Sequence, residues 1–341
     1  MLKVDSQILV RSMANKAKVI PIEEAELLRC QGWLAADLHV HTTCSHDVIP
    51  TSALKPEALY NKALRAGMDF VTFTDHNTVE AYDILGWEKD KLVTGVEISI
   101  RDDDIVGHTL HLNVYDFTKD QFQEMAEISL IGDLMGLLAY LNRSSLPYTY
   151  NHPFWFEPRE KPNLAAVLSV MGLFPVIEYN RHRAQRKNEI VVELAQKFEK
   201  GLTATTDTHS GRVGEIYTLS KGEDFGEYFR RIREGGSYVA VTVLTKEDIV
   251  REVNAWIDLL SCPDLIQSGE IISTGVSYMD GILGVLTGET FRSFPRLYRY
   301  TLNLCRKLSC SGLPASLYLR SEGSMVPEIE RQLSGILGKK F

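Results

Sequence analysis

The histidines of this sequence cluster at places where they could bind metal. Seven of the nine lie at or within a few residues of predicted strands, which scattered core or surface histidines would not do. His39 and His41 are two residues apart, so a strand can present both imidazoles to one point. Imidazole combined with carboxylate suits zinc, manganese or iron. The pattern therefore indicates a metal site at one end of a sheet.

Further candidate ligands follow later predicted strands. They occur in the segments 74–77, 95–97, 108–112, 151–153 and 206–209. In a β/α barrel the carboxyl ends of the strands meet in one cleft, where catalytic sites are found. So many candidates exceed the three or four ligands of one catalytic zinc. We therefore expect a multinuclear site, with about two or three manganese, iron or zinc ions.

Short β-rich runs alternate with helical stretches between about residues 34 and 242. Strands are predicted over residues 34–39, 70–74, 92–98, 110–115, 148–151, 176–179, 202–206 and 238–243. Helices are predicted over residues 56–66, 120–141 and 190–198, although two glycines weaken the second. This alternation predicts an α/β fold with a mostly parallel sheet.

The chain divides into three predicted parts: an N-terminal lead-in (1–33), an α/β domain (34–242) and a helical C-terminal extension (243–341). In the extension, helices are predicted over residues 246–260, 291–308 and 326–337. No apolar run reaches the ~18 residues of a membrane span, and residues 1–5 lack a signal-peptide pattern. The five cysteines show no CxxC spacing, so we expect a cytoplasmic protein. A net charge of −8 provides no basic field for nucleic acid or membrane.

Several segments together resemble a known family. Residues 37–43, 72–78, 95–99, 151–153 and 205–210 are similar, in order, to the motifs of the PHP (polymerase and histidinol phosphatase) family. The resemblance spans roughly residues 34–242. It implies a distorted (β/α)7 barrel with a trinuclear metal site, and hydrolysis of a phosphate ester through a metal-bound hydroxide. Carried over position by position, it implies as metal ligands His39, His41, Asp47, His76, Glu97, His111, His152, Asp207 and His209.

Three of these residues are also implied to be catalytic. Glu97 matches a carboxylate that bridges metal ions, and Asp207 with His209 forms the final pair. Either member of that pair could manage the leaving-group proton. Asp75 and the segment 178–180 are expected to surround the ligands rather than bind metal.

Two ligand positions stay open. The family's first motif usually continues Ser-Asp-Gly, whereas this chain has Ser-His-Asp, so His46 competes with Asp47. On the fourth predicted strand His108 competes with His111. The Leu-His-Leu alternation around His111 is typical of a strand and favours it.

A basic run precedes the helix predicted at 190–198. It contains Arg181, His182, Arg183, Arg186 and Lys187. It is either a solvated helix start or a site for substrate phosphate, which the bidentate fork of arginine suits. The second interpretation makes Arg181 and Arg183 candidate substrate-binding residues. Arg212, three residues after His209, is a comparable candidate.

The favoured function is hydrolysis of a small phosphomonoester. Phe154 and Trp155 follow the His-Pro motif where a nucleotide phosphatase of the family would carry arginine, which places a nucleotide substrate in doubt. Stacking on a substrate ring and core packing explain the aromatic residues at 148–156 equally well. The alternatives are a metallohydrolase of another ester, a nuclease and a catalytically silent metal-binding module.

Overall fold

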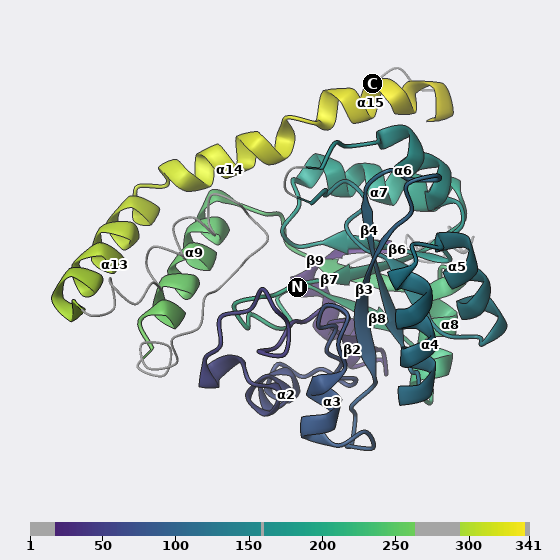
Figure 1. The fold of residues 1–341 in the computed structure, drawn as a ribbon, viewed down its shortest axis with the longest axis horizontal. Helices are drawn as coiled ribbons and strands as arrows, with labels where there is room; N and C mark the ends of the chain where they lie inside the picture. Colours follow the sequence, from purple (N-terminus) through teal and green to yellow (C-terminus); the bar gives the residue numbers. More distant parts are fainter. Residues whose placement is uncertain (1–17, 158–159, 263–293, 338–341) are drawn as a thin grey trace, which may run out of the picture.

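The computed structural model describes residues 18–157, 160–262 and 294–337, which form two β-sheets surrounded by helices (Figure 1). The first sheet has the strand order β1-β9-β8-β2 and the second β3-β4-β5-β6-β7. The strands are β1 (Lys18–Pro21), β2 (Leu34–Ala36), β3 (Gly95–Arg101), β4 (Thr109–Tyr115), β5 (Tyr148–Tyr150), β6 (Val176–Asn180), β7 (Gly201–Thr205), β8 (Tyr217–Ser220) and β9 (Tyr238–Val241).

Helices cover the sheets and continue beyond them to the C-terminal end. Those of the first part are η1 (Ile22–Glu24), α1 (Ala25–Arg29), η2 (Ser52–Leu54), α2 (Pro56–Arg65), α3 (Glu80–Leu85), α4 (Lys119–Leu130), α5 (Leu134–Arg143), α6 (Leu164–Met171), α7 (Gln185–Lys197) and α8 (Phe225–Arg233). The last ones are α9 (Lys246–Leu260), α13 (Pro295–Cys310), α14 (Leu313–Gly323) and α15 (Val326–Leu337).

The mixed α/β class is confirmed, but the prediction of a mostly parallel sheet is wrong for several pairs. Strand β4 is antiparallel to both β3 and β5, and β8 is antiparallel to β2 and β9. The connection between β3 and β4, residues 102–108, is shorter than the dozen or so residues of a parallel crossover. Strands β1 and β8 were not predicted.

The regular strands do not close into a barrel, because they lie in two separate sheets. The predicted strand 70–74 contributes only an isolated parallel bridge between Val71 and Leu92. Two more isolated parallel bridges, Val40 to Thr208 and His76 to Glu97, join segments that carry candidate ligands. These irregular segments therefore lie side by side although they belong to no regular strand.

The predicted helices at 56–66, 246–260 and 326–337 correspond to α2, α9 and α15. The single helix predicted at 120–141 is instead two helices, α4 and α5. Gly132 breaks it with a φ of +75°, and a Cβ there would lie 2.4 Å from the carbonyl oxygen of Arg101. Helix α13 covers most of the helix predicted at 291–308, whose first three residues lie outside the described residues. Helix α14 was not predicted.

The C-terminal helices extend along one side of the molecule, and the last of them lies against helices α6 and α7 (Figure 1). Helix α9 contacts α13 and α14, and α15 contacts α6 and α7. Arg186 of α7 donates a 2.7 Å bond to Glu330 of α15, which joins the two helices. No helix within the described ranges is long and apolar enough to cross a membrane.

Candidate metal centre

Two buried carboxylates hold together the segments that carry the candidate ligands. Asp37 accepts hydrogen bonds from the backbone N–H and hydroxyl of Thr206, at 3.0 and 2.6 Å. Burial raises the pKa of Asp37 to about 6, against the lowering effect of these bonds. Asp75 accepts bonds from the N–H and hydroxyl of Thr42, at 2.6 and 2.7 Å. Asp75 thus fixes the segment beside His41, which fits the supporting place expected for it.

The structure brings together all nine side chains predicted as ligands. They form four overlapping groups, and within each group one ligand atom from every residue lies within 4.8 Å of the others. The groups are His41, Asp47, His76 and His209; His39, His152 and Asp207; His39, His41 and Glu97; and His76, Glu97 and His111. Because four of the residues belong to two groups each, the groups form one continuous cluster.

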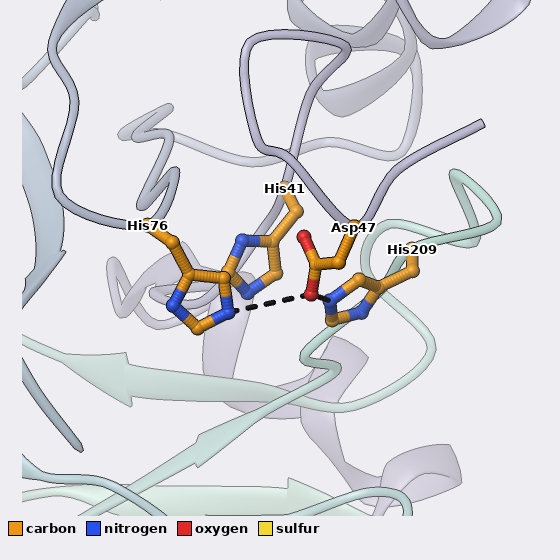
Figure 2. Close-up of side chains that lie close together, drawn as sticks. All are labelled: His41, Asp47, His76 and His209. Atoms are coloured by element: carbon orange, nitrogen blue, oxygen red, sulfur yellow. Dashed lines mark hydrogen bonds and ion pairs between the residues drawn. The ribbon is translucent and has the colours of Figure 1, made fainter. Parts of the chain in front are cut away.

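Asp47 lies between two imidazoles in the first group (Figure 2). Its Oδ2 is 2.7 Å from Nε2 of His209 and 3.4 Å from Nε2 of His76. His46 is exposed and belongs to none of the four groups, although its ring lies 5.2 Å from that of His76. The geometry therefore places Asp47, and not His46, among the ligand atoms.

Glu97 occupies the middle of the cluster. Its Oε2 lies 3.0 Å from Nε2 of His39 and 3.3 Å from Nε2 of His41. Its Oε1 lies 3.2 Å from Nδ1 of His111 and from Nε2 of His152. Its Oε2 also lies 3.5 Å from Nε2 of His76, so one carboxylate faces five imidazoles, an arrangement open to bridging two cations.

The structure distinguishes the two competing histidines, His108 just before strand β4 and His111 within it. His111 points into the cluster, whereas His108 packs its ring against Phe156, 4.9 Å between centroids, and belongs to no ligand group. Glu157 was missed by the sequence analysis, yet its Oε1 lies 3.2 Å from Nε2 of His111. No motif marks Glu157, because its position depends on how the chain turns after strand β5.

Residues of strand β6 orient the ligands. Glu178 lies 2.7 Å from Nδ1 of His39, leaving the Nε2 of that ring directed at Glu97. Its other oxygen accepts the backbone N–H of His152, at 2.7 Å. Asn180 donates to Asp207 at 3.0 Å. Such outer contacts fix the ring orientation and tautomer of metal-binding histidines.

The backbone is left-handed at two of the candidate ligands. His152 has a φ of +25° and Asp207 a φ of +49°, and Asn77, beside His76, has a φ of +52°. Non-glycine residues in this region cost about 1–3 kcal/mol each and concentrate at functional sites. The backbone is thus strained at residues whose side chains point into the cluster of candidate ligands.

The charges of the cluster suit divalent cations. Burial opposes ionisation of Glu97, but His39, His76 and His111 hold its pKa well below the usual range. Burial would lower the pKa of His111, yet Glu97 and Glu157 raise it to about 9. The Nε2 atoms of His39 and His41 lie only 3.0 Å apart, so their lone pairs repel unless a proton or a cation lies between them. The imidazole and carboxylate donors therefore fit manganese, iron or zinc, whose binding would displace protons.

A cavity of about 280 Å³ opens onto the cluster. Tyr148, Tyr150 and Phe154 are buried in the core, whereas Trp155 lines the cavity. Arg181 and Arg183 line it as well, but Arg212 does not. Some of the aromatic and basic residues singled out in the sequence are thus buried in the core or lie outside the cavity, whereas others line the cavity.

The basic run reaches the first turn of helix α7, which begins at Gln185, but it is not solvated, so that part of the interpretation is wrong. Arg181 is 6% exposed and Lys187 3%. Arg181 pairs with Asp248 at 3.1 Å, and Arg183 pairs with Glu322 at 3.2 Å. The partners lie on α9 and α14, so the run contacts the C-terminal helices, a role that the sequence analysis did not consider.

Arg212 lies behind the cavity wall. It forms an ion pair with Glu215 and approaches Glu252 at 3.5 Å. Both carboxylates line the cavity, so they lie between Arg212 and the space that a substrate would occupy.

Three solved structures resemble this chain at low identity. They are PsfC from Pseudomonas syringae (15% identity, TM-score 0.47, 67% of this chain and 99% of that one), a Bifidobacterium adolescentis protein assigned by inference as a metal-dependent phosphoesterase (17%, 0.38, 58% and 94%), and a Chromobacterium violaceum amidohydrolase with bound sulfate and no metal (14%, 0.39, 59% and 96%). No curated protein matches the chain.

The sequence model of the PHP domain matches residues 37–243, which is more than half of the chain. The match contains every one of the nine clustered side chains, from His39 to His209. This protein therefore belongs to the PHP domain family.

Proposed function

We propose that the protein hydrolyses a small phosphomonoester with the help of two or three divalent metal ions. The observation that carries this proposal is the overlap of four ligand groups on the wall of one cavity. Membership of the PHP family together with this cluster indicates a metal-dependent hydrolase. Several adjacent cations suit phosphoryl transfer, because they neutralise charge on both attacking and leaving oxygens. The modest volume of the cavity favours a small substrate.

The chain's own residues supply orientation and proton transfer. Bound divalent cations would neutralise phosphoryl oxygens and lower the pKa of water. Glu97 would help to hold the cations, because its two oxygens face different imidazoles of the cluster. His209 lines the cavity, and its Nδ1 lies 3.1 Å from the backbone oxygen of Asp207. We assign the leaving-group proton to this pair, His209 and Asp207.

Arg181 and Arg183 are proposed to contact the substrate phosphate. Nη1 of Arg181 and Nε of Arg183 are buried and have no hydrogen-bond partner among the described residues. Each can therefore still donate to a phosphate oxygen while its carboxylate partner neutralises its charge. For Arg212 the same role remains a prediction, which its place behind Glu215 does not favour.

We also propose that the domain is a distorted barrel spanning residues 34–242, preceded by a lead-in (1–33) and followed by a helical extension (243–341). The isolated bridge between Val40 and Thr208 supports the closure, because it joins the segment after β2 to the segment after β7.

The proposal is tested by metal analysis and a substrate panel. Protein purified without chelator is expected to contain more than one equivalent of manganese, iron or zinc, and to release phosphate from phosphomonoesters. At most one bound ion after reconstitution would contradict a multinuclear site. Cleavage of only bis(p-nitrophenyl) phosphate would favour a nuclease, and cleavage of only p-nitrophenyl acetate another esterase. Full metal content without any turnover would identify a silent metal-binding module.

A further inference from the structure

The cavity has a wall that the PHP match does not include. Beyond residue 243, Ile249, Val253 and Trp256 of helix α9 and Tyr318 of helix α14 line it. Their side chains offer apolar and aromatic surface. The helical extension therefore contributes to the same cavity as the ligand cluster.

Helix α9 is held firmly at this wall. Thr245 begins it with a capping box, in which its hydroxyl accepts the N–H of Asp248 and its own N–H donates to the Asp248 carboxylate. Asp248 also pairs with Arg181 at 3.1 Å. Further along, the indole of Trp256 donates to Glu252 at 3.1 Å. The apolar face of α9 is thereby positioned before any ligand binds.

Aromatic surface also adjoins the candidate ligands. The ring of Trp155 lies 5.1 Å from that of His152 and 5.3 Å from that of His111, between centroids. Arg183 lies over the same indole, 5.9 Å from its centroid. An organic group attached to a phosphate at the cluster would therefore meet the Trp155 ring first.

The charged side chains that line the cavity outside the ligand cluster are paired with one another or with groups behind the wall. Arg181 pairs with Asp248, and Arg183 pairs with Glu322. Of the other lining carboxylates, Glu215 and Glu252 face Arg212, and Glu157 faces His111. No uncompensated cation among the described lining residues is therefore available to a second anionic group.

We propose that the cavity takes a phosphomonoester whose organic part is a small aryl group without a second negative charge, and that helix α9 together with Trp155 selects it. This inference rests on the proposed function for the position of the phosphate. The apolar walls bind the ring, and a further anion is rejected because its burial would find no unpaired cation in the wall.

Binding of unreactive phosphonates to the metal-loaded, full-length protein tests the selection without any turnover. By calorimetry, phenylphosphonate is expected to bind about tenfold more tightly than methylphosphonate, which has no ring. A second pair of probes, 4-carbamoylphenylphosphonate and 4-carboxyphenylphosphonate, has nearly the same shape and differs by one negative charge. The carboxylate is expected to bind about tenfold more weakly than the carbamoyl compound.

Matched variants assign these effects to the wall. Glu252→Gln should reduce the difference in affinity between the carbamoyl and carboxyl probes severalfold. Glu247→Gln, on an exposed part of the same helix, should leave this difference in affinity unchanged. Trp155→Ala should weaken phenylphosphonate but not methylphosphonate, and Trp87→Ala, outside this cavity, should change neither.

The outcomes separate this inference from the proposed function. Equal affinities for phenyl- and methylphosphonate, or for the carbamoyl and carboxyl probes, would overturn the inference and leave a phosphate-binding metal site intact. Absence of binding by every phosphonate to metal-loaded protein would overturn both. Selective binding without hydrolysis of the matching phosphate esters would support the inference and contradict the proposed phosphoesterase.

Discussion

Glu322 of helix α14 lies between two cations that precede and begin helix α7. Its Oε1 is 3.2 Å from Nη1 of Arg183, and its Oε2 is 3.3 Å from Nζ of Lys187. Its Oε2 also accepts the backbone N–H of Ala184. Because Arg183 lines the cavity, this carboxylate ties the C-terminal extension to the proposed substrate site.

Replacing Glu322 by glutamine should lower the free energy of unfolding by about 3 kcal/mol at pH 7, because two buried cations lose their counter-charge. Burial opposes ionisation of Glu322, but Arg183 and Lys187 hold its pKa below the ordinary 4.5. A depressed carboxyl pKa stabilises the fold above pH 4.5, and this contribution is lost as the pH falls through the lower, folded value. The difference between wild type and variant, measured by urea unfolding, should therefore shrink only below about pH 4.5.

The control for this prediction is Glu328→Gln on helix α15. Glu328 pairs with Arg331 on the surface, so its replacement should cause no measurable loss of stability. The difference in unfolding free energy between wild type and Glu322→Gln should change between pH 7 and pH 3.5. If it does not, the ion pairs do not stabilise the extension.

His111 on strand β4 and His108 just before it should differ in their effect on metal content. His111→Ala removes an imidazole 3.2 Å from Glu97, and we expect it to release metal and abolish most activity. His108→Ala removes a ring that packs on Phe156, so its effect should be on stability alone. Elemental analysis of folded, monodisperse samples makes the comparison. The reverse order would mean that the segment before β4 reaches the metals.

Glu97→Gln should cost one metal ion and at least about a hundredfold in turnover. The substitution keeps the size of the side chain but removes the charge that faces five imidazoles. Steady-state kinetics and metal content are to be determined on the same samples. Glu97→Gln protein with full metal content and wild-type turnover would rule out a bridging role for this carboxylate.

Glu178→Gln should weaken metal binding about 10- to 100-fold without removing any ligand. Glu178 holds Nδ1 of His39 and the backbone N–H of His152, so its charge supports two candidate ligands at once. Competition with a fluorescent chelator would measure the loss. Glu189→Gln, on the outer part of α7, is the matched control and should bind metal as wild type does. Unchanged affinity in Glu178→Gln would mean that packing alone orients His39.

The sequence by itself indicated most of the residues that gather at the cluster. The spacing of two between His39 and His41 is a local pattern. The full ligand set followed from the resemblance to the PHP motifs, which left His46 open against Asp47 and His108 open against His111. The patterns that predicted helices were also local. Pro56 indicated the start of α2, and the pattern of residues 246–260 predicted α9. Both kinds of signal depend on near neighbours in the chain.

The tertiary structure decided which distant segments contact one another. The antiparallel direction of β4 relative to β3 depends on how these strands pair. The loop after β2 places Asp47, rather than His46, in the cluster because Asp47 contacts His209. The partners of Arg181 and Arg183 lie on helices far along the chain, at Asp248 and Glu322. Ion pairs and cavity walls form between segments that are far apart in the sequence, and no local sequence pattern shows which distant segments will meet. Only the folded chain therefore reveals that the basic run binds carboxylates of the C-terminal extension.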